Sequence, residues 1–149
     1  MLRRYSRQIL LLLIIVFGGH TLSLAQADQI ERLWYNTEKT AKIQIYKATD
    51  GNYYGKIVWL KEPLRDGKPK IDIHNPDKAR RSDPVMGLMI LKKFKKDGDH
   101  GYDDGTIYDP KNGKTYKCKI SFDGDKLDVR GYVGFSFIGR TEVWTKADQ

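Results

Sequence analysis

The sequence predicts an all-β domain, built as a single antiparallel meander that closes into a barrel. Three observations indicate this fold class. Apolar and polar residues alternate with a period of two, no long segment has the period of a helix, and six Asp-Gly or Asn-Gly dipeptides stand between the alternating runs. These dipeptides readily supply the positive φ angles of tight hairpin turns. Because an open meander of this length would expose unpaired strand edges, we expect it to close.

The amino-terminal segment, residues 1–27, has the layout of a secretory signal peptide. Three arginines precede an uninterrupted apolar run at 9–17, and small residues follow at 23–27. We place the cleavage after Ala27, with Ala25 as the alternative. The apolar run is shorter than the roughly 20 residues that a membrane span needs, so we expect an exported protein, in the periplasm or outside the cell, without an integral span after cleavage.

The remaining residues, 28–149, correspond to one domain. Residues 1–27 hold three of the 27 Lys and Arg and none of the 19 Asp and Glu, so the processed chain carries a net charge of +5. This excess is moderate and well mixed with acids, which argues against a nucleic-acid partner. Cys118 is the one cysteine, so an intramolecular disulfide is excluded. Its alternation with Tyr116 and Ile120 predicts a small core residue on a strand.

Five runs have the composition or the period of strands: 41–46, 53–61, 116–122, 127–133 and 141–146. The second of these is apolar on both faces from Ile57 to Leu60. We therefore expect its outer side to be covered, and the next segment of the chain is the candidate cover.

That next segment, 62–84, is a long loop. It contains four of the five prolines, no sustained period and many charges of both signs. Two interpretations stay open: a functional flap over one barrel opening, and a proline-stiffened surface connector with one helical turn near 77–82.

Two further segments carry apolar side chains among polar ones. Lys92 to Lys96, followed by two aspartates, predicts a solvated hairpin end. The segment 134–139 begins and ends with glycine and contains Phe135 and Phe137. These aromatic residues either line an apolar entrance at the barrel rim or plug the barrel end.

The sequence identifies no catalytic residue, metal ligand or cofactor site. The two histidines of the processed chain, His74 and His100, lack metal-ligand spacing, and the acidic segment 97–101 lacks the glycine and glutamate that a calcium loop requires. A nucleophile elbow and a phosphate-binding glycine loop are also absent from the sequence. These observations favour a binding role over an enzymatic one.

An ordered set of motifs extends over almost all of residues 30–146. They are Trp59-Leu60-Lys61-Glu62-Pro63, Asp66-Gly67-Lys68-Pro69, His74-Asn75-Pro76-Asp77, Arg81-Ser82-Asp83-Pro84-Val85-Met86-Gly87, Gly105-Thr106-Ile107-Tyr108-Asp109-Pro110, Gly113-Lys114-Thr115-Tyr116, Val129-Arg130-Gly131-Tyr132-Val133-Gly134, and Gly139-Arg140-Thr141 to Trp144. The set resembles a family of small exported bacterial proteins, catalogued as a domain of unknown function, whose fold is a lipocalin-like β-barrel. The resemblance implies a barrel of about eight strands and export, and it implies no activity.

The resemblance also implies a structural pair. Such barrels tend to open with Gly-x-Trp on the first strand, whereas this chain has Arg32-Leu33-Trp34. By that likeness, Trp34 closes the barrel base beneath a late arginine, which is Arg140 or, as the alternative, Arg130. A guanidinium over an indole contributes roughly 0.5 to 2 kcal/mol.

We expect an exported protein that holds a small apolar or amphipathic molecule in its barrel. Barrels of about eight strands can hold one small ligand, or their own side chains can fill them. Aromatic residues would supply contact area, and lysine and arginine would orient an acidic head group. The candidate ligand-binding residues are Trp59, Lys61, Arg81, Tyr108, Phe135 and Phe137. The alternative is a cell-envelope protein-interaction module with a filled barrel, which would use the proline-rich loop and the basic hairpin.

Overall fold

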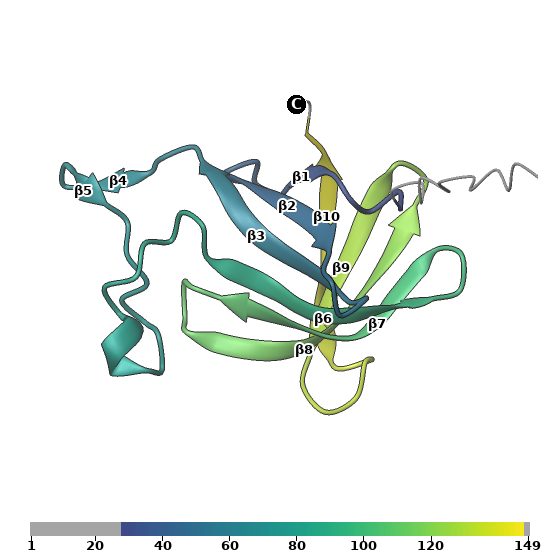
Figure 1. Ribbon diagram of the computed structural model, residues 1–149. Helices are drawn as coiled ribbons and strands as arrows, with labels where there is room; N and C mark the ends of the chain where they lie inside the picture. The colour runs from purple at the N-terminus through teal and green to yellow at the C-terminus, as the bar shows by residue number, and fades with distance from the viewer. Residues whose placement is uncertain (1–27, 148–149) are drawn as a thin grey trace, which may run out of the picture.

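The computed structural model describes residues 28–147, and the expected signal peptide lies outside them (Figure 1). Eight antiparallel strands form a closed barrel in the order β1-β10-β9-β8-β7-β6-β3-β2. They are β1 (Leu33–Tyr35), β2 (Ala41–Lys47), β3 (Tyr53–Leu60), β6 (Met89–Asp97), β7 (Gly101–Asp109), β8 (Lys114–Asp123), β9 (Lys126–Tyr132) and β10 (Gly139–Lys146). The predicted all-β meander, closed into a barrel of about eight strands, is confirmed.

The first and last strands close the barrel. β1 lies between β2 and β10, with Trp34 opposite Ile43 on one side and Lys146 on the other. Beyond the last strand, the amide of Ala147 donates to the carbonyl of Leu33 at 3.0 Å. No strand edge of the described barrel is therefore left unpaired, which removes the usual site of edge-to-edge aggregation.

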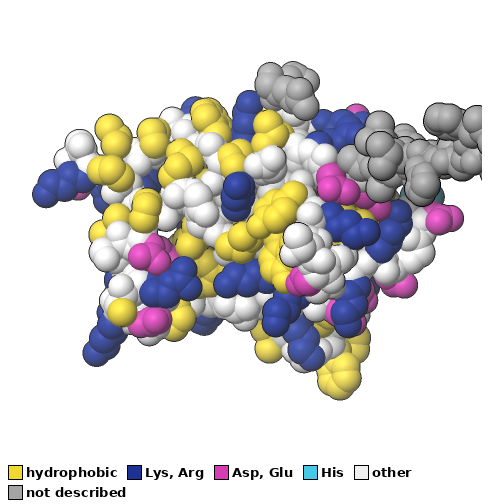
Figure 2. Space-filling view, in the orientation of Figure 1, with side chains coloured by type: hydrophobic (Ala, Val, Ile, Leu, Met, Phe, Trp, Pro, Cys, Tyr) yellow, Lys and Arg dark blue, Asp and Glu magenta, His cyan; other side chains and the backbone are white. Residues whose placement is uncertain are grey.

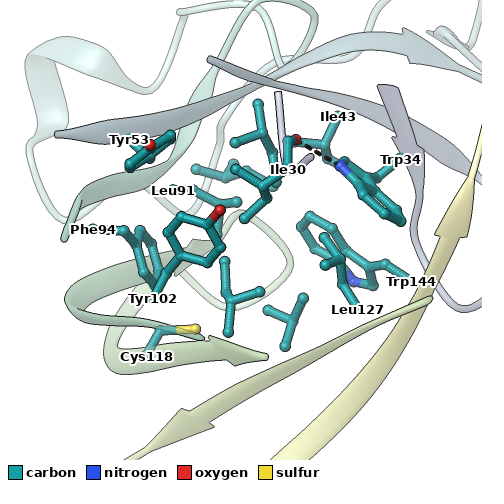
Figure 3. Packing of buried hydrophobic residues seen from close by; sticks show 14 of the residues in the cluster. Ile30, Trp34, Ile43, Tyr53, Leu91, Phe94, Tyr102, Cys118, Leu127 and Trp144 are labelled. Carbon is teal, nitrogen blue, oxygen red and sulfur yellow. Dashed lines mark hydrogen bonds between the residues drawn. The ribbon is translucent and has the colours of Figure 1, made fainter. Parts of the chain in front are cut away.

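The core lies inside the barrel, and every barrel strand contributes to it. The largest fully buried side chains, among them those of Trp34, Trp144, Tyr102 and Phe94, point toward one another in Figure 3. The indole nitrogen of Trp34 donates to the carbonyl of Ile30 at 2.9 Å, so its polar atom is satisfied. Cys118 is completely buried among these residues, which confirms its predicted core role.

The prediction that Trp34 packs beneath Arg140 is wrong, and so is the alternative with Arg130. Trp34 lies opposite Lys146, whereas Arg140 is six residues earlier on β10, roughly 20 Å along a strand. Arg130 of β9 lies opposite Thr141. The edge of the Phe122 ring contacts the Trp34 indole instead, at 6.2 Å between centroids.

A bulge in β3 determines which way Trp59 faces. Lys42 of β2 lies opposite Trp59, whereas the next residue, Ile43, lies opposite Ile57, so Val58 is the extra residue. Since one inserted residue reverses the facing of all that follows, Trp59 shares the outer face with Lys42. The outer cover expected for this strand is incomplete at Trp59, which stays 37% exposed.

A second bulge lies in β7, where the sequence predicted a turn, and that prediction is wrong. The pairing of β7 with β8 skips from Tyr102 to Gly105, and Asp104 adopts a positive φ of 60°. Asp104-Gly105 therefore lies inside a strand, while the other five Asp-Gly and Asn-Gly dipeptides lie in turns. Gly105 is buried, because the ring of Phe94 from β6 lies against it.

The basic segment 92–96 leads into the β6–β7 hairpin turn and its four lysines are exposed, so the predicted solvated hairpin end is confirmed in part. It belongs to β6, where Phe94 is buried and Lys93 has a positive φ of 62°. The lysines on either side of Phe94 face the solvent, and the Phe94 ring is the part of this segment that joins the core.

The connection between β3 and β6 is a surface connector. It contains the hairpin of β4 (Leu64–Arg65) and β5 (Lys68–Pro69), which projects from the barrel, and the 3₁₀ turn η1 (Lys78–Arg80) (Figure 1). The expected helical turn near 77–82 is confirmed. The buried carboxylate of Asp72 anchors the connection to β7, where it accepts hydrogen bonds from the hydroxyl of Tyr108 at 2.8 and 2.9 Å.

The two ends of the barrel differ in their connections. We call one end the closed end; it contains residues 28–32 and the short turns after β2, β6 and β8. We call the other end the open end. It contains the turns after β1 and β7 and the longer β3–β6 and β9–β10 connections. The described residues include no helix long and apolar enough to cross a membrane.

Candidate functional site

The inner wall of the barrel becomes more exposed toward the open end. One row of paired residues runs from Tyr102 through Ile120 and Val129 to Glu142, and only Glu142 is not buried. In the next row, Gly105 and Cys118 are buried, Gly131 is partly exposed and Arg140 is exposed.

A further row, Ile107 opposite Tyr116, is partly exposed on both strands. Together, Ile107, Tyr116, Gly131, Arg140 and Glu142 form what we call the inner mouth face. It is an accessible surface on four adjacent strands that combines apolar area from Ile107 and Tyr116 with one cation and one anion.

Glu142 links this face to the core. The indole nitrogen of Trp144 donates to its carboxylate at 3.4 Å. Burial raises the pKa of the Cys118 thiol to about 12, and the negative charges of Asp103 and Glu142 add to the shift. The thiol is therefore protonated and inert at neutral pH, so it is not a nucleophile for this site.

A partly buried polar cluster lies at the closed end. The carboxylate of Asp28 accepts hydrogen bonds from the hydroxyls of Tyr53 and Tyr102 and from the Lys96 ammonium. Burial raises the pKa of Asp28, but the hydrogen bonds from Lys96 and the tyrosines outweigh it, so the net pKa is lowered. Burial, with the charge and hydrogen bond of Asp28, raises the pKa of Tyr53 to about 12.

Exposed apolar side chains gather at the open end. Of the large exposed hydrophobic residues, all but Val143 lie in or beside the β3–β6 and β9–β10 connections. Figure 2 shows hydrophobic side chains over the β4–β5 hairpin at the upper left and over the β9–β10 connection at the lower edge. The apolar surface therefore lies where the inner wall opens.

The structure does not bring the six predicted ligand-binding residues together. Trp59 lies on the outer face, 6.0 Å from the ring of Tyr35 in an edge-on contact, with the Lys42 ammonium 5.8 Å from its centroid. Lys61 is exposed at the start of the β3–β6 connection, and its backbone amide donates to Thr40.

Arg81 and Tyr108 organise the β3–β6 connection. The Arg81 guanidinium donates to the carbonyl of Asn75 at 2.8 Å. Tyr108 faces outward, because the flanking Ile107 faces inward, and it binds Asp72. Burial, together with the hydrogen bond and charge of Asp72, raises the pKa of Tyr108 to about 12.

Phe135 and Phe137 lie on the β9–β10 connection and do not plug the barrel. They are 68% and 77% exposed, and their rings stack 5.5 Å apart with 7° between their planes. They border the open end, and Phe137 is three residues from Arg140 along the chain.

Two pockets lie away from this face. One, of about 300 Å³, is at the closed end and is lined by Gln29, Arg32, Phe122, Gly124 and Lys146. The other, of about 160 Å³, is on the outer side of β6 and β7, beneath the β3–β6 connection beside Tyr108. Within residues 28–147, no group of three or more His, Cys, Asp or Glu side chains is placed to hold a metal ion.

The sequence profile of a bacterial family, described as "Uncharacterized protein conserved in bacteria (DUF2147)", matches residues 33–146. The chain belongs to the DUF2147 family. Among solved structures, this DUF2147 chain is similar to protein HP1028 from Helicobacter pylori, described as belonging to the lipocalin family. The likeness has a TM-score of 0.72 at 18% identity and covers 81% of this chain and 84% of that one, which shows a lipocalin-like fold. No curated protein matches the chain.

Sequence reasoning missed the inner mouth face of this DUF2147 barrel. Tyr116 alternates with the buried Cys118 and Ile120, and Gly131 with the buried Leu127 and Val129, so the alternation gives Tyr116 and Gly131 the same environment as these core residues. Only the tilt of the strands in a closed barrel decides which inward residues reach the mouth.

Proposed function

We propose that this protein is an exported binding protein that takes a small apolar or amphipathic molecule at the open end of its barrel. The observation that carries the proposal is the difference between the two ends. Inward residues near Asp28 are sealed, while Ile107, Tyr116 and Gly131 offer an accessible apolar wall.

The deep interior is the less favourable place for a ligand, because side chains already occupy it. The ring of Phe94 leaves no space for a Cβ atom at Gly105, and Leu91 leaves none at Gly55. Well-packed interiors tolerate little added volume. A ligand would therefore lie in the outer half of the barrel, against the inner mouth face.

The chemistry of the face suits an amphipathic molecule. Ile107, Tyr116 and the bare backbone of Gly131 provide apolar area. Arg140 lies opposite Gly131 at the rim, where its cation can orient an acidic head group. Phe135 and Phe137 border this entrance.

Two measurements test the proposal. Native mass spectrometry of the purified protein should detect a bound lipid-like molecule, and anilinonaphthalene sulfonate, an apolar anion, should bind and fluoresce. Gly131→Leu, which fills the face, should weaken this binding by at least about tenfold, a loss of roughly 1.4 kcal/mol. Arg140→Gln should weaken binding of the anionic probe less strongly.

The control is Val143→Leu, which enlarges an apolar side chain on the outer side of β10, where Val143 is already exposed. It should leave probe binding unchanged. Equal probe binding by the wild type and Gly131→Leu, with both proteins folded, would overturn the proposal.

A further inference from the structure

The β9–β10 connection, residues 133–138, ends in a small apolar tip. Val133, Phe135, Phe137 and Ile138 are all more than half exposed, and the two phenylalanine rings stack on each other in the solvent. Figure 2 shows this apolar group at the lower edge of the molecule with basic side chains beside it. Exposed apolar groups of this kind usually mark an interaction site.

The tip is held in one conformation. The Arg130 guanidinium donates to the carbonyl of Ser136 at 2.6 Å and to the hydroxyl of Thr141 at 2.9 Å. Within the tip, the amide of Ile138 donates to the carbonyl of Phe135 at 2.9 Å. The aromatic rings are thus presented by an ordered support, so a partner would not need to order the loop on binding.

Basic side chains predominate near the tip, on the adjoining ends of β8, β9 and β10. Residues 114–119 and 130–142 contain one acidic side chain, Glu142, and five basic ones: Lys114, Lys117, Lys119, Arg130 and Arg140. The turns at the closed end are acidic instead, with Asp50, Asp97, Asp99, Asp123 and Asp125. The charge distribution therefore favours an approach of the open end, with the tip, toward a negative surface.

We propose that the barrel docks on an anionic lipid surface through the tip 133–138. Aromatic and branched apolar side chains enter the boundary between head groups and acyl chains, while neighbouring lysines and arginines contact the negative head groups. The two stacked rings suit the apolar boundary of the acyl chains, and the cations beside them suit the negative head groups. This docking goes beyond the binding of a small molecule and does not depend on it.

The test uses the chain from Asp28 onward, which contains every barrel strand, because the apolar run 9–17 would itself bind vesicles. A Trp59→Phe/Phe137→Trp variant places an indole in the tip while Trp34 and Trp144 stay buried. Vesicles of phosphatidylcholine in which about a third of the lipid is phosphatidylglycerol should shift its fluorescence to the blue, and brominated lipid should quench it. Vesicles of phosphatidylcholine alone should do neither.

Phe135→Ser/Phe137→Ser should lower cosedimentation with the anionic vesicles by at least about tenfold. Lys114→Gln/Lys117→Gln should lower it several-fold, and added salt should weaken the wild type. The matched control is Leu64→Ser/Met86→Ser, which removes two exposed apolar side chains from the β3–β6 connection and should leave vesicle binding unchanged.

Two results would overturn the docking proposal. One is vesicle binding that the tip variant leaves intact; the other is an indole at position 137 that stays quenchable from water on the vesicles. Capture of an acidic protein without any vesicle binding would also reject it, in favour of a protein partner. Failure of the ligand proposal would look different, because Gly131→Leu would then bind the anilinonaphthalene probe as well as the wild type does, whatever the vesicle result.

Discussion

The ring of Phe94 lies against Gly105 so closely that a Cβ atom on Gly105 would fall 2.4 Å from three ring atoms. The glycine on β7 and the ring from β6 therefore occupy complementary space in the barrel wall. The same glycine follows the bulged Asp104, so the irregular strand and the aromatic core residue depend on each other.

Gly105→Ala should destabilise the barrel by about 1–3 kcal/mol, because the ring or the strand must move to admit the methyl group. Equilibrium unfolding in urea measures the change. Gly131→Ala is the matched control, since its Cβ would meet Ile107 and Tyr116 at ordinary distances of 3.4 and 3.7 Å. An equal loss in both variants would show that the Phe94 ring does not cause the effect.

Asp28→Asn should destabilise the closed end by about 1–3 kcal/mol at pH 7, because Lys96 and the hydroxyls of Tyr53 and Tyr102 lose a charged acceptor. The folded pKa of Asp28 lies below its ordinary value of 3.8. The stabilisation is therefore present above that pH and is lost as the pH falls through the folded pKa.

Unfolding curves between about pH 2 and 7 measure this dependence. The wild type should lose stability more steeply than Asp28→Asn on the acid side. Parallel curves for the two proteins would contradict the role of the carboxylate. Asp99→Asn, at an exposed turn, provides the comparison.

Tyr108→Phe should release the β3–β6 connection from the barrel. The buried Asp72 carboxylate then loses the Tyr108 hydroxyl, at a local cost of about 1.5–3 kcal/mol. Limited proteolysis should cut within 62–84 at least about tenfold faster, while the barrel stays folded. Tyr46→Phe should not change the cleavage rate, since its hydroxyl contacts only the sulfur of Met89, at 3.8 Å.

The hydrogen bond between Tyr108 and Asp72 should be lost at alkaline pH. Because the folded pKa of Tyr108 is raised to about 12, the contact stabilises the connection fully below the ordinary tyrosine pKa of 10 and is lost as the pH rises through about 12. Protease sensitivity in the wild type should therefore rise in that alkaline range. A wild-type rate that stays flat there would contradict the assignment.

Trp59 should be the tryptophan that acrylamide quenches in the folded barrel. It is 37% exposed, whereas Trp34 and Trp144 are 0% and 2% exposed. Trp59→Phe should remove most of the quenchable fluorescence, and Trp144→Phe should leave it in place. Strong quenching that survives Trp59→Phe would contradict the outward facing that the Val58 bulge imposes.

Much of the fold could be predicted from local pattern. Strict alternation places Ile43, Ile45, Cys118 and Ile120 on inner faces, and the structure buries all four. The six glycine dipeptides indicated the hairpins, with one error at Asp104. Periodicity works here because each strand of the barrel separates a core from solvent.

The rest depends on register, which local pattern does not contain. One extra residue at Val58 turns Trp59 outward, and one at Asp104 converts a predicted turn into a strand. The partner of Trp34 is likewise set by how β10 pairs, and it is Lys146 rather than Arg140. The candidate site was missed for the same reason, because its members meet only across four paired strands.

The position of β1 has a consequence for how the chain reaches its native state. β1 is synthesised first among the barrel strands, yet one of its two neighbours is β10, the last strand, as the pairing of Trp34 with Lys146 shows. Until residues 139–146 are available, β1 and β9 each present a bare edge. The barrel therefore closes late, by pairing two strands that are more than 100 residues apart in the sequence. Such a distant pairing slows folding and leaves the growing polypeptide open to wrong strand pairing. Loss of residues 139–146 would leave an open sheet rather than a shorter barrel.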